Sequence, residues 1–135
     1  MMKLSNDNLE TTGWHRHPRG GGLVQDTAVV AATAWVGSDA KVHGNAQVLD
    51  NAKVYDEAQV YGNAKVFGRA RVYENARVYG HALVYGLAEV FGEAQVHGDA
   101  AVYGDAKVFC EAQVYGNAEV YCYTCLLYTS DAADE

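Results

Sequence analysis

The chain has 135 residues, with 10 lysines and arginines against 17 aspartates and glutamates, and its formal net charge is −7. Three of these negative charges, Asp131, Asp134 and Glu135, lie in the last five residues. The remaining sequence is only mildly acidic and gives no argument for nucleic-acid binding. No apolar run has the length of a signal peptide or a membrane span, so we expect a cytoplasmic protein with no membrane partner.

Residues 1–23 precede the periodic part of the chain and carry a basic cluster, Trp14-His15-Arg16-His17-Pro18-Arg19, followed by three glycines. We expect this segment to cap the first coil of the structure that follows. Covering the unpaired strand edges at the end of a repeat array protects against edge-to-edge association. The alternative is that the His/Arg cluster binds an anion or a metal ion.

Residues 24–124 form a strict repeat of six residues. Valine stands at every sixth position from Val24 to Val120, and alanine stands four residues after each valine from Ala28 to Ala118. An ordinary globular sequence does not keep such a register, so the period predicts a repeat architecture.

One unit of the repeat reads Ala58-Gln59-Val60-Tyr61-Gly62-Asn63. Alternation with a period of two places Ala58 and Val60 on one face of a short strand and Gln59 and Tyr61 on the other. Gly62-Asn63 tolerates the positive φ of a tight bend, so each unit predicts a strand and a corner. One unit cannot bury its Val/Ala face alone, and successive units must therefore coil and stack around one thin core.

These units resemble the hexapeptide-repeat superfamily, in which an aliphatic residue is followed four positions later by a small one. The resemblance covers about three quarters of the chain and implies an all-β fold: a single-stranded, left-handed parallel β-helix shaped as a triangular prism. It implies about 18 residues per coil and about 5.5 coils. The chain departs from the family pattern after the valine, where Tyr or Phe mostly replaces a small residue.

Stacking at 18-residue spacing assigns each outward residue to a column. One wall of the predicted prism carries the most apolar outward side chains. These side chains either form a ladder of rings that stabilises its own sheet or form an interface with another chain. The predicted interface residues are Leu49, Phe67, Leu83, Tyr85, Tyr103 and Tyr121. Closed homotrimers are frequent in the superfamily, so the resemblance implies a homo-oligomer, either a trimer or a longer assembly.

Two further groups are weak candidates for chemistry. His81, Asp99 on the next coil and His97 near the same edge have plausible spacing for an acid–base or metal pair. One corner of the prism gathers carboxylates that either remain dispersed in solvent or collect a divalent or basic partner. This acidic edge consists of Asp39, Asp56, Glu57, Glu74, Glu93 and Glu111.

Two functions follow from these observations. The first is a structural or assembly scaffold, a rigid rod with aromatic walls that self-associates without a cofactor, as in polymer-forming hexapeptide proteins. The alternative, implied only by the superfamily, is an acyl-CoA-dependent acyltransferase whose active-site loop or C-terminal region is missing. The unbroken repeat from Val24 to Thr124 favours the first and argues against an enzyme.

The period ends before residue 125. The string from Cys125 to Glu135 resembles the translation of a transposase adapter used in sequencing libraries. This resemblance implies that residues 125–135 are a non-native, disordered tail and that the natural chain is truncated at about Thr124.

Overall fold

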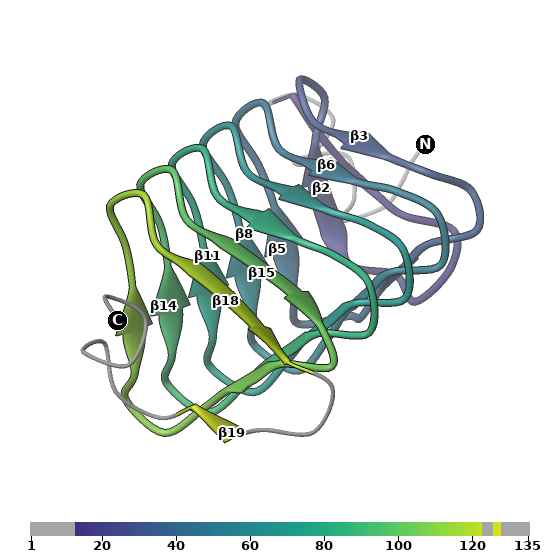
Figure 1. The fold of residues 1–135 in the computed structure, drawn as a ribbon. Coiled ribbons are helices and arrows are strands. Elements are labelled where there is room, and N and C mark those ends of the chain that lie inside the picture. The colour runs from purple at the N-terminus through teal and green to yellow at the C-terminus, as the bar shows by residue number, and fades with distance from the viewer. Residues whose placement is uncertain (1–12, 123–125, 128–135) are drawn as a thin grey trace.

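The computed structural model describes residues 13–122 and 126–127. Apart from one N-terminal strand, its strands stack as three parallel sheets that form the walls of a prism of about six coils, with no helix in the described part. The coils advance toward the viewer in Figure 1 while the chain passes clockwise around the prism, so the winding is left-handed, as predicted. In the ranges that the structure describes, nothing helical is long and apolar enough to cross a membrane.

Each coil contributes one short strand to each wall. Sheet A contains β1 (Trp14–Arg16), β2 (Leu23–Gln25), β5 (Lys41–Val42), β8 (Gln59–Val60), β11 (Arg77–Val78), β14 (Gln95–Val96) and β17 (Gln113–Val114). Sheet B contains β3 (Val29–Val30), β6 (Gln47–Val48), β9 (Lys65–Val66), β12 (Leu83–Val84), β15 (Ala101–Gly104) and β18 (Glu119–Cys122). Sheet C contains β4 (Trp35–Val36), β7 (Lys53–Val54), β10 (Arg71–Val72), β13 (Glu89–Val90), β16 (Lys107–Val108) and β19 (Leu126–Leu127).

The register between coils follows the predicted 18-residue spacing. In sheet A, Val78 pairs with Val60 on the preceding coil and with Val96 on the following coil. All repeat valines and alanines from Ala34 to Val108 have no exposed surface. Each fully buried valine contributes about 1.5–3 kcal/mol relative to exposure, so this narrow Val/Ala core stabilises the solenoid along its whole length.

At many corners of the prism, one residue adopts the left-handed backbone conformation, with a positive φ. Gly62 has a φ of 69°, and the following Asn63 N–H donates to the Gly80 carbonyl of the next coil at 2.7 Å. An added Cβ at Gly62 would lie 2.9 Å from Gly80 N. Stacked corners therefore approach closely enough to favour glycine.

The N-terminal segment lies along the first coil. Strand β1 pairs antiparallel with β2, and Arg19 O accepts a hydrogen bond from Val36 N at 3.1 Å. His17 is 4 % exposed, and its Nε2 lies 2.8 Å from the Ala34 carbonyl oxygen. The basic cluster predicted as a cap or an ion site thus contacts both sheet A and sheet C at this end.

At the other end, β19 pairs with β16, with Leu126 opposite Lys107. This spacing is 19 residues, one more than in the repeat, where Glu89 lies opposite Lys107. The other residues of the predicted non-native tail, 125 and 128–135, lie outside the described residues, so its assignment as a non-native, disordered segment stays a prediction.

Candidate functional site

Each wall carries a ladder of outward aromatic rings, because the residue after each valine occupies the equivalent position on every coil and so lies directly over its counterpart on the preceding coil. In sheet A, the ring centroids of Tyr61 and Tyr79 are 4.9 Å apart, with planes inclined by 4°. The ladder on sheet B contains Phe67, Tyr85, Tyr103 and Tyr121, and that on sheet C contains Tyr55, Tyr73, Phe91 and Phe109. The rings stack on one another through their faces and therefore turn their edges to solvent.

Tyrosine hydroxyls of the ladders form hydrogen bonds with side chains of the next coil. Tyr73 donates to Glu89 at 2.8 Å, Tyr79 donates to Gln95 Oε1 at 2.9 Å, and Tyr103 donates to Glu119 at 3.2 Å. Burial, followed by the hydrogen bond to Glu89, raises the pKa of the Tyr73 hydroxyl above its ordinary value. The first interpretation of the rings, that they stabilise their own sheets, is consistent with these contacts.

The predicted interface residues lie together on sheet B. Phe67, Tyr85, Tyr103 and Tyr121 are consecutive rings with centroids 4.8–5.0 Å apart. Leu83 projects outward from β12 and lies between Lys65 on β9 and Ala101 on β15. Leu49 is half-buried one coil before Phe67 in the same column. We call the outward residues of β6, β9, β12, β15 and β18, with this ring ladder, the sheet B wall.

The acidic edge lies at the corner where the chain passes from sheet C to sheet A, and its members have two different roles. Asp56 and Glu74 have φ values of 56° and 59°. Asp56 Oδ2 accepts from Glu74 N at 3.1 Å, and Glu74 Oε1 accepts from Gly92 N at 2.8 Å. These two carboxylates therefore bridge the left-handed turns of successive coils and are not free ligands.

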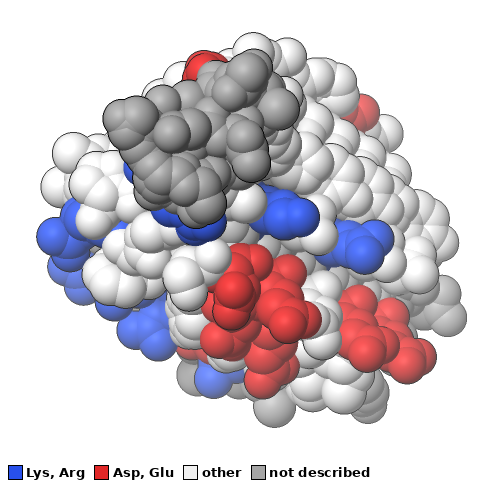
Figure 2. Space-filling model, turned by 180° about the vertical axis from the view of Figure 1, so that it is seen from behind, with Lys and Arg blue, Asp and Glu red and all other residues white. Residues whose placement is uncertain are grey.

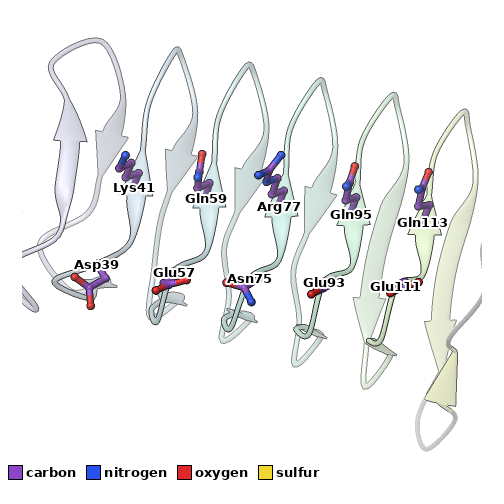
Figure 3. Close-up of a pocket in the computed structure, with 10 residues that line it drawn as sticks. All are labelled: Asp39, Lys41, Glu57, Gln59, Asn75, Arg77, Glu93, Gln95, Glu111 and Gln113. Carbon is purple, nitrogen blue, oxygen red and sulfur yellow. The ribbon is translucent and has the colours of Figure 1, made fainter.

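The other carboxylates line an open groove of about 770 Å³ that follows the solenoid axis. Its two sides are a row at the corner, Asp39, Glu57, Asn75, Glu93 and Glu111, and a row on sheet A, Lys41, Gln59, Arg77, Gln95 and Gln113 (Figure 3). Figure 2 shows aspartate and glutamate side chains gathered in groups on this side of the prism, beside lysine and arginine side chains. The carboxylates of this groove were predicted from their spacing in the sequence, but the amide and basic row that faces them was not predicted as part of a site.

The structure does not assemble His81, His97 and Asp99 into one site. His81 and Asp99 occupy equivalent exposed turn positions on adjacent coils, and His81 N donates to Gly98 O. His97 belongs instead to the sheet A ring ladder, 4.7 Å from Tyr79 and 5.7 Å from Tyr115. The side chains of these three residues are not hydrogen-bonded to one another, and within residues 13–122 and 126–127 no three His, Cys, Asp or Glu side chains converge to hold a metal ion.

Two histidines occupy the sheet A ladder at positions that elsewhere hold tyrosine. The His43 ring stacks on Tyr61 with centroids 4.8 Å apart, and His97 Nε2 is buried without a hydrogen-bond partner in the described part of the chain. Burial lowers the pKa of both imidazoles below the ordinary value of 6.5. The folded state therefore favours the neutral rings.

A pH dependence of stability follows from these two histidines. Their lowered pKa values mean that the unfolded chain binds more protons, so stability is complete above pH 6.5 and decreases as the pH falls below it. We expect His43→Tyr with His97→Tyr to reduce the loss of thermal stability between pH 7 and pH 5. Thermal unfolding followed by circular dichroism tests this, and equal pH dependence in both proteins contradicts it.

These features define a β-solenoid repeat protein, in which stacked short strands enclose one continuous core. A family model described as the YdcK beta solenoid repeat matches residues 58–74, which correspond to about one coil. Neither a curated protein nor a solved structure matches the chain significantly.

Proposed function

We propose that this chain is a structural scaffold, a rigid β-solenoid rod that associates with other copies of itself through the sheet B wall. One observation carries the proposal: the wall presents Leu83 and Ala101 outward beside an unbroken ladder of rings from Phe67 to Tyr121. Contiguous apolar surface of this kind is typical of protein–protein contact sites.

The flatness of the wall supports association with another extended surface. From β2 to β18 the repeat strands recur at 18-residue spacing, so no inserted loop interrupts the wall. Apolar area removed from water contributes about 25 cal/mol per Å². A flat wall gains most from contact with another flat wall, because only such a partner covers several coils at once.

Membership of the hexapeptide-repeat superfamily is part of this proposal. The Val/Ala period and the three-sided prism support it, and the solenoid-repeat match over residues 58–74 is compatible with it. Acyl transfer with acyl-CoA as donor remains the alternative, but no described residue set favours it. The groove at the acidic edge is lined by no histidine, and His81 and Asp99 are not hydrogen-bonded to each other.

The test is a charge placed at the centre of the wall. We expect the unmodified protein to sediment as an oligomer and Leu83→Glu to sediment largely as a monomer, because a carboxylate at an apolar contact must lose its hydration. Tyr115→Glu is the control, since Tyr115 is a 41 % exposed aromatic residue that follows β17 on sheet A, away from the sheet B wall. Analytical ultracentrifugation over a range of concentrations measures the outcome, and an unmodified protein that stays monomeric throughout overturns the proposal.

A further inference from the structure

The sheet B wall contains charges as well as apolar groups, and their order along the solenoid axis is asymmetric. The outward residues of four successive strands, β9, β12, β15 and β18, are Lys65, Leu83, Ala101 and Glu119. A cation thus lies at one end of the row and an anion at the other, with a large and a small apolar residue between them. Lys65 and Glu119 are both exposed.

The order of these four residues is complementary to the same four residues taken in the opposite direction. When a second copy is laid face to face with its axis antiparallel, Lys65 meets Glu119 of the other copy and Leu83 meets Ala101. The two-fold axis then lies in the interface, along the strand direction, between the coils of Leu83 and Ala101. A two-fold contact uses the same patch on both copies, so each favourable pair occurs twice.

The two columns that flank this row agree with the same arrangement. In the ring ladder, Phe67 lies opposite Tyr121 of the second copy, and Tyr85 lies opposite Tyr103. At the border of the wall, the turn residues are Asn63, His81, Asp99 and Asn117, all exposed. The reversal places His81 opposite Asp99 of the other copy and Asn63 opposite Asn117, so no like charges meet in any of the three columns.

Other ways of pairing two walls are less favourable. A two-fold axis that runs along the solenoid and is centred on this row places Lys65 against Lys65 and Glu119 against Glu119, and like charges in contact oppose association. An antiparallel pairing centred on Leu83 itself places Lys65 against Ala101 and His81 against His81. Only the register centred between Leu83 and Ala101 satisfies both charged pairs.

We propose that this protein forms an antiparallel two-fold dimer through the sheet B wall, with Lys65 of each copy facing Glu119 of the other. The inference rests on the proposed function, because it names the partner and the geometry of the self-associating surface. The two ends of such a dimer are equivalent, and at each end β3 and β6 of one copy extend beyond β18 of the other.

A charge exchange tests the register. We expect Lys65→Glu alone and Glu119→Lys alone each to raise the dimer dissociation constant about tenfold, since each variant replaces two exposed attractive pairs with two repulsive ones. The double variant restores the attraction with reversed polarity and is expected to return to within about twofold of the unmodified protein. Lys53→Glu, the same change at an exposed position of sheet C, is the matched control and is expected to have no effect.

A cross-link provides the second measurement. Lys65 and Glu119 lie three coils apart, about 14 Å at the spacing of adjacent strands, so cysteines at the two positions cannot be bridged within one chain. In a background without Cys110, Cys122 and Cys125, chains carrying Lys65→Cys are mixed with chains carrying Glu119→Cys. We expect oxidation to cross-link the mixture and neither protein alone.

The outcomes separate the two proposals. A monomeric unmodified protein overturns self-association and this dimer together. An oligomer that is disrupted by Leu83→Glu, but in which the double charge exchange gives no rescue and the mixed cysteines do not cross-link, leaves the scaffold proposal standing and overturns the antiparallel register. A trimer by sedimentation overturns the register in the same way.

Discussion

Val78→Asp is expected to unfold the central coils of the solenoid. Val78 lies in β11 with no exposed surface, and both of its neighbours in the column, Val60 and Val96, are equally buried. The substitution removes a buried valine, worth about 1.5–3 kcal/mol, and introduces a carboxylate that has no partner in an apolar core. We expect a loss of about 5 kcal/mol or more, which is comparable to the whole stability of many domains.

The matched control for this prediction is Arg77→Asp. Arg77 is the preceding residue on the same strand and is exposed, so the same side chain is introduced one position away on the opposite face. We expect a loss of only about 1 kcal/mol, which comes from the like charges that Arg77→Asp brings beside the carboxylates of the groove. Chemical denaturation followed by circular dichroism compares the two, and a Val78→Asp protein that unfolds at the same denaturant concentration as Arg77→Asp would contradict the assigned core.

The six-residue period was sufficient to predict which residues are buried, whereas the left-handed, three-sided prism with 18 residues per coil was predicted from the resemblance to the hexapeptide-repeat superfamily. Once Ala58 and Val60 share a face, the same face must be buried on every coil, and an 18-residue coil brings Val60, Val78 and Val96 into one column. The outward rings follow for the same reason, which is why the ladder from Phe67 to Tyr121 was predicted as a set.

The period could not predict how corner side chains are used. Sequence reasoning placed Asp56 and Glu74 in one acidic edge with Asp39, Glu57, Glu93 and Glu111. The structure separates them because Asp56 and Glu74 adopt left-handed backbone and turn their carboxylates to the backbone N–H of the next coil. This role depends on φ and on rotamer, and neither follows from residue type and spacing alone.

The N-terminal segment was likewise predicted only in outline. Its position before the repeat favoured a cap, but the antiparallel pairing of β1 with β2 and the burial of His17 depend on contacts outside the period. The candidate site of His81, His97 and Asp99 shows a related limit. Their expected positions on adjacent coils at one edge suggested a site, whereas the side chain of His97 is held in a ring stack by Tyr79 and Tyr115.

The walls and the corners of this molecule impose different constraints on sequence. A wall position such as Leu83 points outward and changes little in the core when it is substituted, so association can be tuned there independently of folding. A corner position stacks directly on the backbone of the next coil, and its substitution affects two coils together. Variants at the two kinds of position should therefore separate assembly from stability.

Gly80→Val is the strongest test of the corner constraint. Gly80 has a φ of 70°, and an added Cβ would lie 2.9 Å from Gly98 N on the next coil. Left-handed backbone costs about 1–2 kcal/mol for a residue with a Cβ, and a tight contact adds about 1–3 kcal/mol. We expect Gly80→Val to lose about 3 kcal/mol in chemical denaturation.

Gly80→Asp distinguishes the cause of that loss. At another corner, Asp56 tolerates a φ of 56° while its carboxylate accepts from the N–H of the next coil, so aspartate can offset part of the backbone cost. We expect Gly80→Asp to lose only about 1 kcal/mol, near the low end of the left-handed penalty. If valine and aspartate destabilise the protein equally, steric exclusion of any Cβ at Gly80 dominates, and the bridging role assigned to Asp56 and Glu74 does not transfer between corners.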